Sequence, residues 1–160
     1  METHQKQDIC CPEFDPAAWD EKLFEWRNKS FIKDSVATFF YMPLNFSKVM
    51  RRLDKKVTDA QAVVPDWLCL SDHTSPWKMD LYLAVDKDVE GAEKSSISGK
   101  FFSKVYEGPY KNAGKWTKDF EAFTTSRNMN VSKMYTWYTT CPKCAKKYGK
   151  NYVVLMGKTI

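Results

Sequence analysis

The chain has 160 residues, of which 43% are hydrophobic and 15% aromatic. This length fits one ordinary domain whose core needs no disulfide or metal, and the composition excludes a disordered chain. No apolar run approaches the roughly 20 residues of a membrane span, and the polar start METHQKQD is not a signal peptide, so we expect a cytoplasmic protein without a membrane partner. The net charge of +5 comes from Lys and Arg interleaved with Asp and Glu, which argues against nucleic acid as a partner.

The first segment, residues 1–30, is predicted to be an arm that packs on the body of the chain. It contains the turn formers Pro12 and Pro16 and several large rings, which would be costly to leave in water. We expect the body to be one domain at residues 31–160, with two halves at about 31–88 and 95–160. The rings of the arm are Phe14, Trp19, Phe24 and Trp26.

The first half begins with a predicted strand at 34–42, which is rich in β-branched and aromatic residues and ends before Pro43. Asn45 is then a good N-cap for a helix at 46–60, where apolar residues recur at helical spacing. Two further strands are predicted at 66–72 and 78–86, around a polar turn at 72–76.

The second half repeats this order of elements. A strand at 98–108 leads to a helix at 112–128, and a strand pair follows at 132–140 and 151–159. Because each half has one helix for its strands, the economical solution lays both helices on one face of a shared antiparallel sheet. We therefore predict an α+β fold, a tandem pseudo-twofold β-α-β-β repeat with a ligand cleft on the other face of the sheet.

Several long motifs resemble those of a known family. They are CCPxFDP near the start, SPWKMDLYLAVD in mid-chain, EGPYKNAGKW before the second helix, and YTTCPKCAKKYGKNYVV near the end. With these motifs the chain resembles the GyrI-like small-molecule-binding domain, which has a SOUL-like fold, and above all a stand-alone bacterial subfamily often labelled "hydrolase". The resemblance covers nearly the full chain.

The resemblance implies a hydrophobic, aromatic cleft, often with a buried carboxylate that meets cationic drugs. Some stand-alone members hydrolyse cyclopropane-bearing genotoxic compounds, so the implied function is detoxification by sequestering or hydrolysing hydrophobic, cationic or electrophilic molecules. The alternative is a protein-interaction module that inhibits a partner such as DNA gyrase, because relatives with the name-giving activity bind gyrase. No helix-turn-helix segment fits before residue 31, so a regulator role is unsupported.

Strand alternation selects candidate cleft residues. In the strand at 78–86, Asp80 and Tyr82 share a face, opposite the leucines that suit a helix-covered core. Trp137 shares a face with Tyr135 in the same way. For any single ring, filling of the core is the alternative, but a set of rings with few polar groups is typical of a ligand site. The predicted ligand-binding residues are Tyr41, Trp67, Trp77, Asp80, Tyr82, Phe102, Tyr106 and Trp137.

Glu107 is the predicted general acid or base. It precedes Gly108 at a strand-to-helix junction, and desolvation by neighbouring rings would raise its pKa. The Tyr110 hydroxyl would steady the departing group. The alternative is a surface carboxylate that pairs with a lysine. In drug-binding relatives the acid commonly sits on a late strand, but the segment 134–140 has none, and the nearest acids in predicted strands are Asp80, Asp86 and Glu107.

The cysteines leave three interpretations open. Five cysteines without an export signal indicate a reducing compartment. The CPKC motif supplies two thiolates, whereas a tetrahedral structural zinc needs four ligands, so a zinc clasp would have to recruit the arm. The alternatives are a redox pair and a turn of free thiols, and no other cofactor is required. The predicted zinc ligands are Cys10, Cys11, Cys141 and Cys144.

Overall fold

We analysed a computed structural model, which describes residues 14–40, 42–139, 146 and 149–160. The chain divides into two compact units. The inserted unit is Trp26–Gly99, and the terminal unit combines the chain up to Glu25 with Lys100–Ile160. Over the residues described, no helix is both long and apolar enough to cross a membrane.

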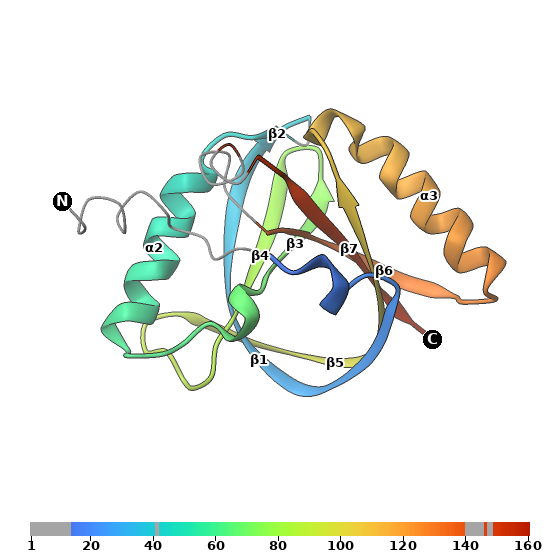
Figure 1. The fold of residues 1–160 in the computed structure, drawn as a ribbon. Coiled ribbons are helices and arrows are strands. Elements are labelled where there is room, and N and C mark those ends of the chain that lie inside the picture. The colour runs from blue at the N-terminus through green and yellow to red at the C-terminus, as the bar shows by residue number, and fades with distance from the viewer. Residues whose placement is uncertain (1–13, 41, 140–145, 147–148) are drawn as a thin grey trace. The chain divides into compact units, whose positions relative to one another are not determined.

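The inserted unit consists of an antiparallel sheet and one long helix, with strand order β2-β1-β4-β3. The helix α2 lies against these strands in Figure 1. The short 3-10 turn η2 precedes β3, and β1 starts in the terminal unit before it enters this one. The elements are β1 (Lys22–Phe39), β2 (Met42–Pro43), α2 (Phe46–Asp59), η2 (Pro65–Trp67), β3 (Cys69–Ser75) and β4 (Lys78–Ala84).

The core of the inserted unit lies between α2 and one face of its sheet. Val49, Leu53 and Val57 form the buried stripe of α2 because residues three and four apart share a helix face. They pack on buried residues of β1 and β4 such as Ile32 and Leu81. As predicted, the helix is capped at Asn45, although the Asn45 amide oxygen accepts the N–H of Ala37 at 2.9 Å and makes no cap bond.

The terminal unit repeats this plan with strand order β6-β7-β5. Trp116 and Phe120 of its helix pack on Phe102, Val153 and Leu155 of the sheet. Figure 1 shows this helix, α3, along the strands of its unit. The elements are η1 (Pro16–Ala18), β5 (Glu93–Glu107), η3 (Tyr110–Asn112), α3 (Ala113–Ser126), β6 (Val131–Tyr138) and β7 (Tyr152–Thr159).

The predicted fold class is confirmed: the protein is α+β, with antiparallel strands, two helices and the order β-α-β-β in each half. Two predicted boundaries differ from the structure. The first is the start of β1, which begins at Lys22, within the predicted arm. The second is the predicted turn at 72–76, which is largely strand because β3 continues to Ser75 before a tight connection to β4. Pairing with β4 therefore overrides the low strand propensity of Ser, Asp and Thr.

Candidate functional site

The acidic face is the side of the inserted sheet that faces away from α2. Because Leu81 and Leu83 of β4 pack with α2, alternation turns Asp80 and Tyr82 to the other side. Asp72 of β3 is the direct register partner of Asp80. Opposed residues of an antiparallel pair have Cβ atoms about 5 Å apart, so the two carboxylates are neighbours. The acidic face comprises Lys33, Ser35, Asp72, Asp80 and Tyr82.

Both carboxylates of the acidic face are buried: Asp72 is 7% exposed and Asp80 6%. Burial disfavours a charged carboxylate unless donors or cations compensate it. The Ser35 hydroxyl donates to Asp80 Oδ1 at 3.0 Å, and the ammonium groups of Lys78 and Lys33 lie 3.6 and 3.8 Å from its carboxylate oxygens. The two ammonium contacts are long, and the side chain of Lys78 is 57% exposed, so both lysines can turn to solvent.

Aromatic rings accompany this charge. The Lys33 ammonium lies 5.7 Å from the centroid of the Tyr82 ring, and the Phe31 ring meets Tyr82 edge-on at 6.4 Å. Tyr82 and then Asp80 raise the pKa of Lys33, so this lysine stays charged at neutral pH. A carboxylate beside an electron-rich ring face is the combination that attracts organic cations in proteins. The face therefore has the chemistry of a cation site.

The aromatic face is the corresponding side of the terminal sheet, away from α3. Trp137 of β6 lies there, 2% exposed, between the rings of Phe14 at 5.3 Å and Trp19 at 5.0 Å. Both rings meet Trp137 edge-to-face. The indole Nε1 has no hydrogen-bond partner among the described residues, although burial of an unpaired donor costs about 1–3 kcal/mol. The aromatic face comprises Phe14, Trp19, Phe24, Phe101, Trp137 and Tyr152.

Residues 14–20 are tied to the edge of β5. The Ser103 hydroxyl donates to the Trp19 carbonyl at 2.5 Å, and the Val105 N–H donates to Asp20 Oδ1 at 3.1 Å. The start of the described chain therefore covers Trp137 with its own rings.

Two predicted cleft residues lie on the helix side of the terminal sheet. Phe102 stacks on Phe123 of α3, with ring centroids 5.4 Å apart. Tyr106 stacks on Trp116 at 5.8 Å, and its hydroxyl donates to Asp119 at 2.6 Å. Burial, and then the bond to Asp119, raise the pKa of Tyr106. The structure thus separates these two rings from Trp137, which is on the opposite face of the same sheet.

Each remaining predicted cleft or catalytic residue is described by its own surroundings. Trp67 is 38% exposed in η2, and Trp77 is 54% exposed beside Phe39 and Phe40. Glu107 is exposed at the end of β5. Tyr41 and the side chain of Tyr110 lie outside the described residues.

The predicted zinc clasp lies outside the described residues, because Cys10, Cys11, Cys141 and Cys144 all fall there. Within the described part of the chain, no three or more His, Cys, Asp or Glu side chains form a group that could hold a metal ion. The described cysteine, Cys69, belongs to the core under α2, and burial raises the pKa of its thiol to about 12. The zinc site stays a prediction.

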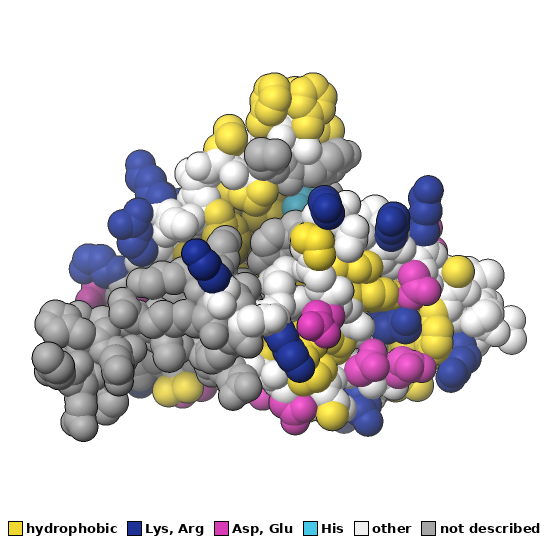
Figure 2. Space-filling view, turned by 45° about the horizontal axis from the view of Figure 1, so that its top comes forward, with side chains coloured by type: hydrophobic (Ala, Val, Ile, Leu, Met, Phe, Trp, Pro, Cys, Tyr) yellow, Lys and Arg dark blue, Asp and Glu magenta, His cyan; other side chains and the backbone are white. Residues whose placement is uncertain are grey.

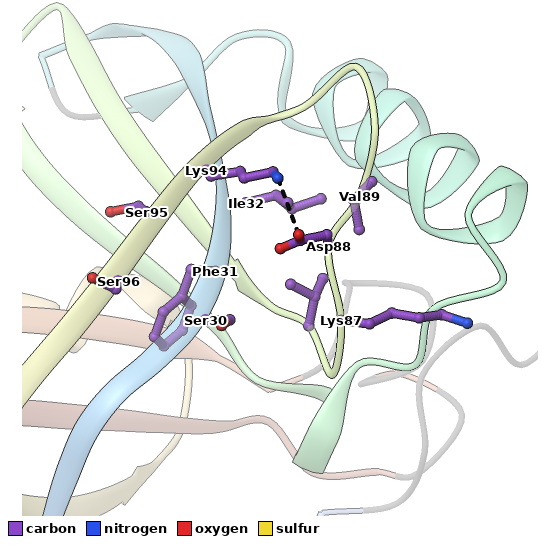
Figure 3. Close-up of a pocket in the computed structure, with 10 residues that line it drawn as sticks. Ser30, Phe31, Ile32, Lys87, Asp88, Val89, Lys94, Ser95 and Ser96 are labelled. Carbon is purple, nitrogen blue, oxygen red and sulfur yellow. Dashed lines mark ion pairs between the residues drawn. The ribbon is translucent and has the colours of Figure 1, made fainter.

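A small pocket of about 270 Å³ opens elsewhere in the inserted unit. Figure 3 shows Asp88 and Lys94 joined across it, with an ion-pair distance of 3.3 Å, and Lys87 directed away. Its apolar wall includes Phe31 and Ile32, and the serines of the lining are Ser30, Ser95 and Ser96. The Asp88–Lys94 ion pair is internally neutral, and the third charged residue of the lining, Lys87, is directed away from the pocket, so the pocket offers little charge to select a ligand.

Asp72 is the site residue that sequence reasoning missed. The segment 72–76 is polar and ends in a proline, a composition that is frequent in turns, so the sequence predicts a turn there. The available signal was alternation, because Leu70 and Asp72 share a side of a strand on which Cys69 and Ser71 face the helix.

The sequence matches the family described as Bacterial hydrolase over residues 1–159. The chain belongs to this family. No curated protein matches the sequence. Among solved structures, this bacterial hydrolase family member is similar in fold to the EcmrR C-terminal domain, with TM-score 0.67 and 10% identity over 89% of this chain and 98% of that one.

Two further solved structures share the fold. A hydrolase from Listeria innocua has TM-score 0.60 and 10% identity over 99% of this chain and 98% of that one. SAV2435, solved bound to tetraphenylphosphonium, has TM-score 0.52 and 12% identity over 88% of this chain and 94% of that one. At these identities the likeness concerns the fold, and it agrees with the predicted GyrI-like architecture.

Proposed function

We propose that this member of the bacterial hydrolase family binds amphipathic organic cations at the acidic face. The observation that carries the proposal is the pair Asp72 and Asp80, opposed in register and each more than nine-tenths buried, with the Tyr82 ring beside them. Binding of a hydrophobic cation at such a place is favourable for two reasons. The cation neutralises buried negative charge, and its own apolar surface is removed from water.

The two lysines act as replaceable counterions in this proposal. Lys33 and Lys78 approach Asp80 only to 3.8 and 3.6 Å, and neither is fully buried. A ligand cation would take their place, and the ammonium groups would recover their hydration. The GyrI-like architecture and the tetraphenylphosphonium-bound neighbour support a cationic ligand class.

Binding of tetraphenylphosphonium, measured by isothermal titration calorimetry, tests the proposal. Asp80→Asn keeps the shape of the side chain and its acceptor for Ser35 but removes the charge. We expect affinity to fall about tenfold or more, as a contact to a charged group contributes about 1.5–3 kcal/mol.

Asp59→Asn is the matched control, because Asp59 is an exposed acid of α2 that pairs with Lys55. It should bind like the unaltered protein. Equal affinity of the Asp80 and Asp59 variants, with both folded by circular dichroism, would contradict a role for the acidic face.

Hydrolysis is the second candidate function, and the adjacency of Asp72 and Asp80 favours it. A carboxylate close to the reacting carbon can act as a general base for water, and a neighbouring carboxylate can position that water. One carboxylate would take a proton from water, the water oxygen would bond to a carbon of a strained ring, and the ring carbon released as that bond breaks would take up the same proton from the carboxyl group. The product is heavier by one water.

Mass spectrometry of recovered cyclopropane-type electrophiles checks for that added water. If the reaction takes place at the acidic face, Asp72→Asn should abolish turnover and Glu107→Gln should leave turnover unchanged. The opposite result would assign the acid–base role to Glu107. Compounds that are retained but unaltered would leave binding as the function.

A further inference from the structure

The aromatic tip is a group of four large hydrophobic side chains that the fold leaves in solvent. Phe39 is 55% exposed, Phe40 65%, Leu44 66% and Trp77 54%. Phe39 is the last residue of β1 and Phe40 follows it, Leu44 follows β2, and Trp77 lies between β3 and β4. Figure 2 shows hydrophobic side chains gathered at the top of the molecule in that view. A contiguous exposed apolar group of this kind is typical of an interaction site.

The tip is held in its exposed position by hydrogen bonds behind it. The Thr38 N–H donates to the Trp77 carbonyl at 2.9 Å, and the Thr38 hydroxyl donates to the Pro76 carbonyl at 2.8 Å. The Leu44 N–H donates to the Ala37 carbonyl at 2.9 Å. Two turns are thereby joined through the buried Thr38. Because these hydrogen bonds fix the backbone that carries the rings, binding would cost little further conformational entropy.

The rings also support one another. Phe39 and Phe40 meet edge-on at 4.7 Å, and the Trp77 ring lies 5.0 Å from Phe40 and 5.7 Å from Phe39. Side by side, they form one apolar surface of two phenyl rings and an indole. Trp is the side chain that best suits the boundary between water and hydrocarbon, since its ring is apolar and its N–H is polar.

The sequence around the tip carries an excess of positive charge. Residues 35–53 contain Lys48, Arg51 and Arg52 and no Asp or Glu. Lys78, which follows Trp77 directly, pairs with the buried Asp80 at 3.6 Å. Arg52 is neutralised by Asp34, which leaves the exposed Lys48 and Arg51 on the first turns of α2. Hydrophobic rings next to exposed cations are complementary to an anionic surface with an apolar layer beneath it.

We propose that the aromatic tip inserts into the interfacial layer of an anionic lipid membrane, with Lys48 and Arg51 against the headgroups. This is a surface contact, and it replaces the expectation that the chain has no membrane partner, which rested on the lack of a spanning segment. A protein partner is disfavoured because a stable interface buries about 800 Å² per side from about 20–30 residues. The tip has four large side chains on two turns, which suits shallow insertion.

Sedimentation with lipid vesicles tests the proposal on the full chain. We expect binding to vesicles of equal parts phosphatidylcholine and phosphatidylglycerol, weaker binding as salt is added, and little binding to phosphatidylcholine alone. Phe40→Ser should lower the partition constant roughly tenfold, the scale of burying one large apolar side chain. Lys48→Gln should lower it about fivefold, the scale of one cation near an anionic surface.

Val63→Ser is the control, because Val63 is 61% exposed but lies outside the tip. It should bind like the unaltered protein. Lipids brominated on their acyl chains should quench tryptophan fluorescence, and Trp77→Phe should remove that quenching while it retains vesicle binding.

Three results would overturn the proposal. The first is a lack of binding to the anionic vesicles by the folded, unaltered protein. The second is equal binding by the Phe40 and Val63 variants. The third is self-association in analytical ultracentrifugation that Phe40→Ser abolishes while vesicle binding persists, which would assign the tip to a second copy of the chain. None of these depends on whether the acidic face binds a cation.

Discussion

At the scale of residues, Asp34 of β1 and Arg52 of α2 form a fork of two hydrogen bonds, each 2.7 Å long. The hydrogen bonds from Arg52 hold the pKa of Asp34 below its ordinary value of 3.8. A carboxyl group whose pKa is lower in the folded than in the unfolded protein stabilises the fold at pH values above its unfolded-state pKa. This stabilisation is lost as the pH falls through its folded-state pKa.

Asp34→Asn should therefore lower the free energy of unfolding by about 1 kcal/mol at neutral pH, a small value because the Arg52 side chain is 46% exposed. The difference should vanish once the pH is below the folded pKa. Urea unfolding at both pH values measures it. A constant difference at all pH values would show that the pair acts through shape and not through charge.

The sequence predicted single residues well where alternation was regular. It placed Asp80 and Tyr82 opposite the helix-facing leucines of β4, and the structure agrees. It could not pair Asp72 with Asp80, because register is a tertiary property fixed by the tight β3–β4 connection. It also grouped Phe102 with Trp137, since alternation within a strand does not say which of its two sides meets the helix.

At the scale of elements, α3 approaches β7 at Gly157. A Cβ atom there would lie 3.0 Å from Val131 Cγ1 and 3.1 Å from the ring of Phe120, which is 1% exposed. Gly157→Ala should thus overpack the core of the terminal unit and lower the free energy of unfolding by about 1–3 kcal/mol. Thermal unfolding followed by circular dichroism measures the change.

Gly114→Ala is the opposite case, on α3 itself. No atom lies within 4 Å of a Cβ at Gly114, and Ala favours a helix over Gly by about 1 kcal/mol. This variant should be more stable than the unaltered protein. If Gly157→Ala also stabilised the protein, the contact of β7 with Phe120 would not be as tight as the structure has it.

The two helices were predictable to within two residues at each end because their apolar residues follow the 3.6-residue period. The start of β1 was not predictable in this way. Among its residues Lys22–Lys29, only Phe24 and Trp26 are half-buried at alternate positions, so the hydrophobic pattern gives a strand signal too short to extend β1 this far. The pairing of such a segment is decided by the neighbouring strands.

At the scale of the whole molecule, each unit has a hydrophobic cluster of its own. Leu53 is fully buried in the cluster under α2, and Phe120 is 1% exposed in the cluster under α3. The chain passes between the units at residues 25–26 and 99–100. Partial unfolding of a native protein tends to involve one such compact unit at a time. One unit can therefore unfold while the other stays folded.

Leu53→Ala should lower the free energy of unfolding by about 2–5 kcal/mol, because it removes buried methyl groups and leaves a cavity under α2. Native-state hydrogen exchange locates the effect. We expect faster exchange in amides of Trp26–Gly99, with smaller changes in Lys100–Ile160, and Phe120→Ala should produce the reverse pattern. Equal acceleration in both units by either variant would mean that the clusters open together, in one cooperative transition, and that a ligand bound to either face would protect the entire chain.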